Sequence, residues 1–361
     1  MAMTEKTKRK YRRTAKQIRS RYFNETGIQP EDDCARFQAW LVRIYRTIAP
    51  RSRRLYRNAL HHFQGAHHPE CMPDPIPKGL PKVAEIRKQY GRRGSAMKAK
   101  SMNAETEQAI DSELARLALD VKFKIALSGS DDDSGDTIPP SILWAQALMR
   151  AGVVFGLRPG EWFRARFVAP DDDPTEMDGE FELFMEGRRL YLHVVNGKAG
   201  NGRAFGSMRT LMIDLKYVDE NALEAASWLI EQAQKVTEKQ FDRIIENTRA
   251  VLYHAIERCG RPCRPRGSGR VTLYTARHQF AANAKHAGMS ELEIAALMGH
   301  ASTETATQHY GRKRHGRSRD GVTPVKPHPG DVQRVMRIQQ EKNRIREQKA
   351  RRPASRFRMK P

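Results

Sequence analysis

The stretch LYTARHQFAANAKHAGMSELEIAALMGHASTETATQHYGR, residues 273–312, carries Arg277, His300 and Tyr310 in that order. His300 stands ten residues before Tyr310, in a segment that matches neither a strand nor a plain amphipathic helix. Polar residues that give this pair a chemical meaning lie closer to the N-terminus. They are Arg158 in FGLRPGEW and Lys198 in VNGKAGNGR.

These cations and the tyrosine form a set suited to attack on a phosphodiester without a metal ion. As a pentacoordinate phosphorus forms, its non-bridging oxygens need cationic donors, and the arginine fork fits phosphate geometry. A lysine on a turn, such as Lys198, suits protonation of the leaving oxygen. A tyrosine suits the nucleophile because a phenolate later leaves readily. The pattern therefore predicts Tyr310 as the nucleophile.

The composition indicates a polyanionic partner. The 361 residues include 65 Lys and Arg against 42 Asp and Glu, which gives a formal net charge of +23. A protein this basic most often binds nucleic acid, although ribosomal and anionic-membrane partners remain open on charge alone. The length allows two domains, each with its own core.

The sequence also indicates where the protein resides and which sites it lacks. The apolar run ILWAQALMRAGVVFGL is interrupted by Arg150 and too short for a membrane span, and no secretory signal is recognisable. The 4 cysteines are too few for a disulfide scaffold and are expected to be reduced, in a cytoplasmic, nucleoid-associated protein. Cys259 and Cys263 in CGRPC are a weak zinc half-site without a second pair, so no metal is predicted.

Composition changes along the chain predict four regions. Apolar residues at helical spacing predict a helical hairpin over residues 32–65. The Gly- and Lys-rich stretch YGRRGSAMKAKS, residues 90–101, predicts the linker between two domains. The regions are a basic N-terminal arm (1–21), a helical domain (22–98), a mixed domain (99–325) and a basic C-terminal tail or helix (326–361).

Within the mixed domain, PSILWAQALMRAGVVFGL predicts a buried helix that leads to RPGEW. The segments FELFMEG, RRLYLHVVNG and RTLMIDL predict a small antiparallel sheet with a turn near Lys198. In the tail, apolar residues at helical spacing predict a helix over 331–340, and the basic residues of 342–360 are expected to bind phosphates. The alternative is a disordered basic tail.

The order of these motifs resembles the tyrosine recombinases of the phage-integrase family. GLRPGE resembles the family's first arginine box, including the acidic residue Glu161 three places after Arg158. ARHQFA followed by LMGH resembles the second box, and HYG resembles the nucleophile segment. The similarity covers roughly residues 100–312, and the hairpin at 32–65 is similar to the family's N-terminal core-binding domain.

The resemblance implies an all-α core-binding domain and a mixed α+β tyrosine-recombinase catalytic domain with a small antiparallel sheet, which together encircle duplex DNA. It implies staggered cleavage through a covalent 3′-phosphotyrosine, without metal, nucleotide or other cofactor. The implied partners are double-stranded DNA, a homotetramer in the synaptic complex, possible accessory DNA-binding proteins, and no membrane. In such a tetramer, the helix over 331–340 would contact a neighbouring subunit. The implied catalytic residues are Arg158, Lys198, Tyr274, Arg277, His300 and Tyr310, with Glu161 orienting Arg158.

The chain departs from the family pattern at two places. Tyr274 stands three residues before Arg277, where the family usually has His or Lys. A phenol can donate a hydrogen bond to a phosphate oxygen, but it is a poor general base at neutral pH. The interval from His300 to Tyr310 is one residue longer than is usual.

The resemblance implies a site-specific recombinase that integrates, excises or resolves a mobile element or replicon. Three alternatives stay open. A type IB topoisomerase or a telomere-resolving enzyme would use the same chemistry. A DNA-binding protein with a degenerate site is the alternative to which Tyr274 lends weight. A basic RNA- or ribosome-associated protein is compatible with the charge but does not explain five ordered motifs.

Overall fold

The computed structural model describes residues 5–67, 75–90, 99–127, 140–168, 189–197, 204–260, 263, 269–304, 310–317 and 322–351. The chain divides into two compact units, residues 1–97 and 98–361. The described part is mostly helical with one small antiparallel sheet, which confirms the predicted mixture of elements. No described helix is long and apolar enough to cross a membrane.

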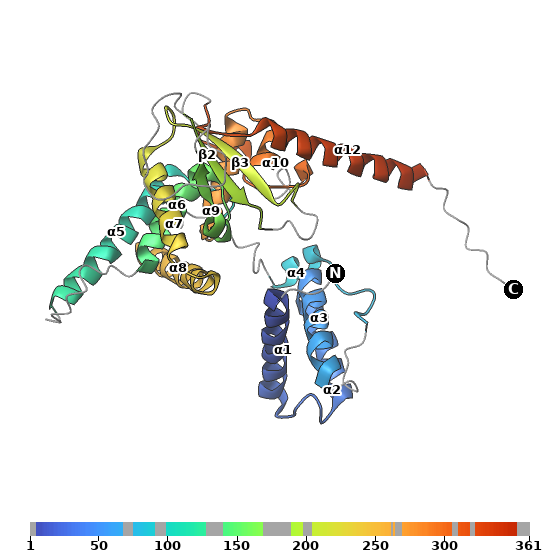
Figure 1. Ribbon diagram of the computed structural model, residues 1–361. Coiled ribbons are helices and arrows are strands. Elements are labelled where there is room, and N and C mark those ends of the chain that lie inside the picture. The colour runs from blue at the N-terminus through green and yellow to red at the C-terminus, as the bar shows by residue number, and fades with distance from the viewer. Residues whose placement is uncertain are drawn as a thin grey trace. The chain divides into compact units, whose positions relative to one another are not determined.

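Unit 1, blue in Figure 1, contains helices joined by loops and no strand among its described residues. Asp33 accepts the backbone N–H of Arg36 at 2.9 Å and so begins the second helix with a side-chain cap. The helices are α1 (Glu5–Thr26), α2 (Cys34–Thr47), α3 (Pro50–His67) and α4 (Val83–Tyr90). The apolar core of the unit is formed by Ala15, Ile18, Tyr22, Phe37, Trp40, Leu41, Ile44, Ala59 and Leu60.

The predicted boundary between a basic arm (1–21) and a helical domain (22–98) is wrong. Helix α1 runs through that boundary without a break, and it packs against α3. Ala15, Ile18 and Tyr22 lie at helical spacing and are almost fully buried in the unit 1 core. The predicted helical hairpin has a wide apolar face, and α1 is the third helix that covers it.

Unit 2 is organised around one buried helix, α6 (Pro140–Phe155), which packs against four neighbours. The largely apolar sequence of α6 explains why most of its residues are buried, and it confirms the predicted helix. Arg150 lies on the one half-exposed face, where it pairs with Asp111. Its neighbours are α5 (Ala104–Leu127), α7 (Glu220–Gln234), α8 (Glu238–Cys259) and α9 (Leu273–His286). The unit also contains a 3₁₀ helix, η3 (Pro159–Arg164), a short helix, α10 (Glu291–Leu297), and a second 3₁₀ helix, η5 (Lys313–His315).

A four-stranded antiparallel sheet lies beside this helical core, with strand order β1-β2-β3-β4. In the central pair, Leu192 stands opposite Leu211 and Leu190 opposite Ile213. Residues 181–187, which include the predicted strand FELFMEG, and the predicted turn at Lys198 lie outside the described residues. The strands are β1 (Arg166–Val168), β2 (Arg189–Val195), β3 (Met208–Asp214) and β4 (Val325–Pro327).

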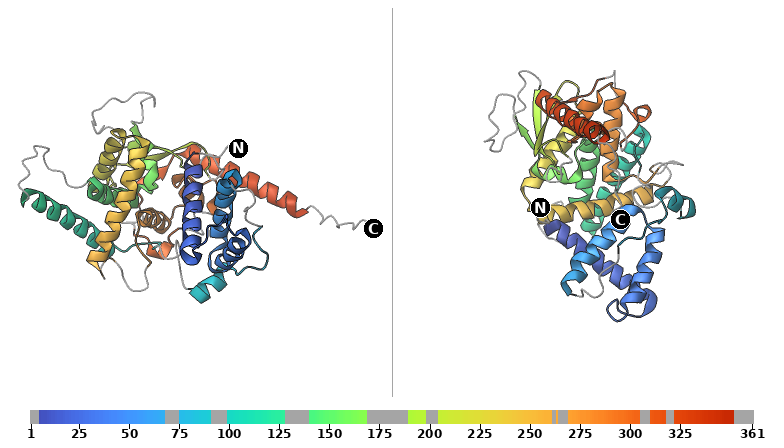
Figure 2. Two further views of the ribbon diagram at one scale, coloured as in Figure 1. Left: turned by 90° about the horizontal axis from the view of Figure 1, so that it is seen from below. Right: turned by 90° about the vertical axis from the view of Figure 1, so that its right-hand side faces the viewer.

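The predicted tail at 326–361 begins inside this sheet, so its boundary is wrong as well. Strand β4 pairs with β3, and the last described helix, α12 (Pro329–Arg351), follows directly. Val335 is fully buried against α10, together with Phe205. Figures 1 and 2 show the first part of α12 beside α10 and the rest extending beyond it. The apolar stripe predicted to contact a neighbouring subunit therefore covers the chain's own α10.

The cysteines correct a further expectation. Cys259 and Cys263 form a disulfide with a Cα–Cα distance of 5.9 Å, and Cys34 is disulfide-bonded too, so the described cysteines are not reduced thiols. Helix α8 ends at Cys259, and Gly260 with φ of 71° turns the chain back, which brings the two sulfurs together. Sulfurs joined in this way are not available as thiolate ligands for zinc.

Candidate active site

The two arginine segments meet because α6 and α9 approach each other closely. A Cβ atom on Gly152 of α6 would lie only 2.8 Å from Cβ of Ala276 on α9. At the end of α6, Gly156 adopts φ of 67°, and a Cβ there would lie 2.2 Å from the Phe280 ring. Only glycine combines this backbone conformation with this contact. The chain can therefore turn at Gly156 and place the following residues beside α9.

Arg158 and Glu161 are held by the first turn after Gly156. The backbone N–H of Arg158 donates to Glu161 Oε2 at 2.8 Å, and its guanidinium Nη1 donates to Glu161 Oε1. Pro159, at the first position of η3, favours this tight turn. Both side chains are almost fully buried. Glu161 thus contacts Arg158 through both of its carboxylate oxygens, and its role of orienting that arginine for the reaction stays a prediction.

Three arginines surround the single carboxylate of Glu161. Besides Arg158, Arg209 Nη2 donates to Oε2 at 2.9 Å, and Arg277 Nη1 lies 3.4 Å from the same oxygen. Burial alone raises the pKa of this carboxyl group, but the three guanidinium charges outweigh burial and lower it well below the usual range. The cluster therefore carries more positive than negative charge, and an anion would stabilise it.

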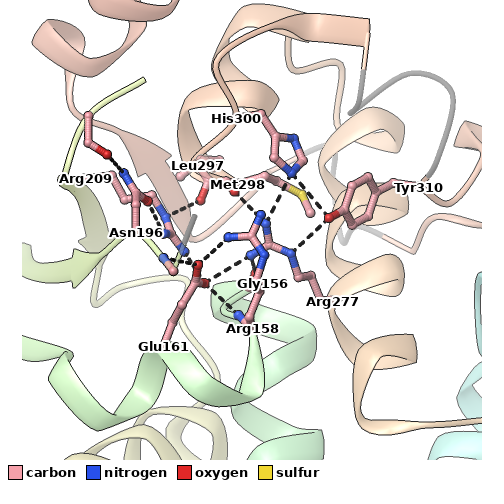
Figure 3. A network of polar contacts seen from close by, with 12 residues as sticks. Gly156, Arg158, Glu161, Asn196, Arg209, Arg277, Leu297, Met298, His300 and Tyr310 are labelled. Atoms are coloured by element: carbon pink, nitrogen blue, oxygen red, sulfur yellow. Dashed lines mark hydrogen bonds and ion pairs between the residues drawn. The ribbon is translucent and has the colours of Figure 1, made fainter. Parts of the chain in front are cut away.

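Arg277 is completely buried on the first turns of α9, and the three nitrogens of its guanidinium group contact three different partners (Figure 3). Nη1 donates to the carbonyl of Gly156 and Nη2 to the carbonyl of Met298, each at 2.5 Å. Nε faces the hydroxyl of Tyr310 at 3.3 Å. Arg277 thus links three chain segments and holds one N–H toward the predicted nucleophile.

His300 follows the turn that ends α10. Its backbone N–H donates to the carbonyl of Ala295 at 2.8 Å, and its side chain is 3% exposed. Nε2 lies 3.3 Å from Tyr310 Oη and 3.5 Å from Arg277 Nη2. Burial, followed by the nearby guanidinium charges, lowers the pKa of the imidazole to about 2, so His300 is neutral. Because Arg277 can only donate, a bond between them uses the Nε2 lone pair.

Tyr310 is half-buried and lies between two histidines. Its ring centroid is 5.2 Å from that of His300 and 4.8 Å from that of His278. The next residue, Gly311, is fixed against α9, because a Cβ there would lie 2.7 Å from the His278 carbonyl oxygen. This anchor limits the positions that the hydroxyl of Tyr310 can take.

The structure brings five of the predicted residues into one site. They are Arg158, Glu161, Arg277, His300 and Tyr310. Tyr274 lies one helical turn before Arg277 and is half-buried, and no hydrogen bond of its hydroxyl is found among the described residues. Lys198 lies outside the described residues, so its role stays a prediction.

Sequence reasoning missed Arg209 and Asn196, which complete the network. Arg209 lies on the same face of β3 as Leu211 and Ile213, and all three are almost fully buried. A charged residue at the inward positions of a strand is costly unless it is paired, and this alternation was the available signal.

Among the described residues, no group of three or more His, Cys, Asp or Glu side chains is placed to hold a metal ion.

Comparisons with known proteins give distant structural similarity. No protein-family model and no curated protein matches the chain. A lambda integrase tetramer bound to a Holliday junction is similar, with TM-score 0.41 and 16% identity, over 89% of this chain and 76% of that chain. The XerA recombinase has TM-score 0.32 and 16% identity, over 88% of this chain and 89% of that one. These solved structures are an integrase and a recombinase, but at such TM-scores they carry no weight in the functional proposal.

Proposed function

We propose that this chain is a site-specific DNA recombinase that cuts and rejoins DNA through a covalent 3′-phosphotyrosine. The observation that carries the proposal is the position of the Tyr310 hydroxyl, 3.3 Å from both Arg277 Nε and His300 Nε2. A nucleophile, a cationic donor and a neutral imidazole thus meet at one oxygen atom. This is the equipment for nucleophilic attack on a phosphodiester.

Each part of the reaction has a group assigned to it. Tyr310 Oη attacks the phosphorus and forms the new P–O bond, while the bond to the 5′ oxygen breaks. Arg158 and Arg277 stabilise the charge on the non-bridging oxygens. In the described residues, the only side-chain hydrogen bond of Arg158 uses Nη1, which leaves Nε and Nη2 for phosphate.

Proton transfer is the remaining requirement. The phenol proton passes to His300 Nε2, which faces Tyr310 Oη at 3.3 Å, in place of the longer contact from Arg277. The negative charge of the bound phosphate raises the imidazole pKa from its low value in the free protein, so that the nitrogen can hold this proton. The departing 5′ oxygen takes a proton to become a hydroxyl, and Lys198 is the donor that the sequence suggests. Tyr274, close to Arg277 on α9, is proposed to donate a hydrogen bond to the phosphate. Because the guanidinium groups supply the charge, the proposal includes no metal ion or other cofactor.

Unit 1 is proposed as the core-binding domain, with unit 2 as the catalytic domain. One face of α1 carries basic and amide side chains suited to phosphates and base edges, together with one serine and one glutamate. These residues are Arg13, Lys16, Gln17, Ser20, Arg21, Asn24 and Glu25. The net charge of +23 favours double-stranded DNA as the partner, and recombination implies a homotetramer on that DNA, with accessory DNA-binding proteins as further partners.

Covalent capture tests the proposal without knowledge of the target site. The full-length protein is mixed with a pool of duplexes that contain a randomised core and a nick, which traps the cleaved state. DNA that stays attached in detergent is sequenced. We expect a recurring core sequence with the wild-type protein and no attached DNA with Tyr310→Phe.

Other outcomes would replace the proposal. Attachment without a recurring sequence, together with relaxation of any supercoiled plasmid, would identify a type IB topoisomerase-like enzyme. Binding of DNA without any attachment would identify a catalytically degenerate DNA-binding protein.

A further inference from the structure

Arg209 is completely buried on β3, and all three nitrogens of its guanidinium group donate to other parts of unit 2. Nε donates to the Leu297 carbonyl at 2.8 Å, Nη1 to Asn196 Oδ1 at 2.6 Å, and Nη2 to Glu161 Oε2 at 2.9 Å. These acceptors come from the end of α10, the end of β2 and η3. A side chain with this burial and these bonds cannot reach DNA, so any effect on the reaction must pass through its partners.

Two arginines hold the turn that carries His300. Arg209 binds the carbonyl of Leu297, and Arg277 binds the next carbonyl, that of Met298. Gly299 then turns the chain with φ of 62°. The position of His300 therefore depends on two guanidinium groups, of which one also faces Tyr310 and the other does not.

Asn196 fixes Arg209 from the side of the hairpin. Its side-chain amide donates to the carbonyl of Gly206 at 3.0 Å while its oxygen accepts from Arg209. It also sits against the turn, because a Cβ on Gly299 would lie 2.3 Å from Asn196 Oδ1. The hairpin, the turn and the arginine therefore fit together at one point.

We propose that Arg209, held by Asn196, is a positioning residue for strand cleavage, which fixes the Glu161 carboxylate and the turn of His300 relative to each other. The inference rests on the proposed recombinase function. Through Glu161, Arg209 holds the carboxylate to which Arg158 is bound. Through Leu297, it holds the turn of His300. One buried side chain thus sets the spacing between the phosphate-binding arginine and the histidine.

The first test separates DNA affinity from cleavage. Arg209→Lys retains the charge but cannot satisfy three acceptors that lie in three directions. Arg164→Lys is the control, because Arg164 lies on the same η3 helix as Glu161 and is exposed. The probe is a duplex with the recurring core sequence found by covalent capture. The single-turnover rate of adduct formation on this duplex is measured for each variant. Dissociation constants are measured in a Tyr310→Phe background, and melting curves report folding.

We expect Arg209→Lys to melt cooperatively, to bind the duplex like its control, and to form adduct about 10²-fold more slowly, the cost of a misplacement near 1 Å. Cleavage at the control's rate would overturn the inference, and so would a rate loss matched by an equal loss of affinity. If wild-type protein forms no adduct with any duplex, the proposed function itself fails.

A second variant and a second signal keep the inference testable if Arg209→Lys does not fold. Asn196→Ala removes one partner of Arg209, while the backbone bond from Asn196 N to the Ser207 carbonyl, at 2.7 Å, remains. We expect it to slow adduct formation without loss of affinity. Without DNA, the imidazole resonances of His300, assigned by their absence in His300→Gln, should move in Asn196→Ala and stay in place in Arg164→Lys. Unmoved resonances would overturn the inference independently of catalysis.

Discussion

The hydroxyl of Tyr310 lies 3.3 Å from Nε of Arg277, although the two residues are 33 positions apart in the sequence. The contact exists because Arg277 is fixed by two backbone carbonyls and Tyr310 by the close packing of Gly311 on α9. In the proposed reaction, the same guanidinium group would face both the attacking phenol and the phosphate.

Replacing Tyr310 by Phe should abolish adduct formation and leave DNA affinity unchanged. The substitution removes only the attacking oxygen and keeps the ring that packs between the two histidines. Adduct formation and dissociation constants on the captured duplex check this expectation. If an adduct still forms, the nucleophile is another residue, and Tyr274→Phe in the same background would identify the next candidate.

Arg158→Lys and Arg277→Lys should each slow adduct formation by about 10²–10³-fold, because a point charge does not reproduce the bidentate fork. Their effects on stability should differ. Arg277 also holds the Gly156 and Met298 carbonyls, so Arg277→Lys should lower the melting temperature more than Arg158→Lys. Equal melting temperatures would contradict the structural role given to Arg277, and cleavage at the wild-type rate would remove that arginine from the site.

Glu161→Gln should strongly destabilise unit 2. The change leaves three buried arginines without their shared counter-charge, and removing one partner of a buried ion pair costs about 3–5 kcal/mol. The free energy of unfolding in urea measures this loss. Glu238→Gln is the control, because its ion pair with Arg164 is exposed and contributes at most about 1 kcal/mol. Similar losses in both variants would contradict the central role of Glu161.

The pKa of His300 predicts a loss of stability in acid. The imidazole pKa is lowered to about 2 in the folded protein, against its ordinary value of 6.5. Below pH 6.5 the unfolded chain therefore binds a proton that the folded chain excludes, and stability falls as pH falls, by about 1.4 kcal/mol per pH unit. The free energy of unfolding, measured in urea at pH 6 and at pH 5, should fall less with pH in His300→Gln than in wild type. The exposed His254→Gln should keep the wild-type slope, and identical slopes in all three proteins would contradict the prediction.

Helix α12 should act as part of the fold of unit 2. Val335→Ala should destabilise the protein by about 2 kcal/mol, because Val335 is completely buried against α10. The neighbouring Met336→Ala should have little effect, since Met336 is 39% exposed. Melting curves of the two variants test the difference. If Val335→Ala keeps the wild-type melting temperature but no longer forms oligomers on DNA, the predicted contact with a neighbouring subunit would be restored.

Much of this fold could be predicted from local patterns. The mostly apolar run predicts α6 because a helix with so few polar residues must be largely buried, and the alternation in RTLMIDL predicts β3. Boundaries that depend on distant contacts could not be predicted. Helix α1 looked like a charged arm because its apolar residues are few, and β4 has only three residues and is a strand because it pairs with β3.

The sequence by itself determined the residue types of the site and their order, since Arg158, Glu161, Arg277, His300 and Tyr310 were identifiable from their motifs. It did not determine which of these residues touch one another. The close approach of Gly152 to Ala276 and of Gly156 to Phe280 decides that, because it brings the ends of α6 and α9 together. Tertiary structure also decided the partners of Arg209. Its charge is tolerated in the core only because Glu161, Asn196 and Leu297 supply acceptors from three separate segments.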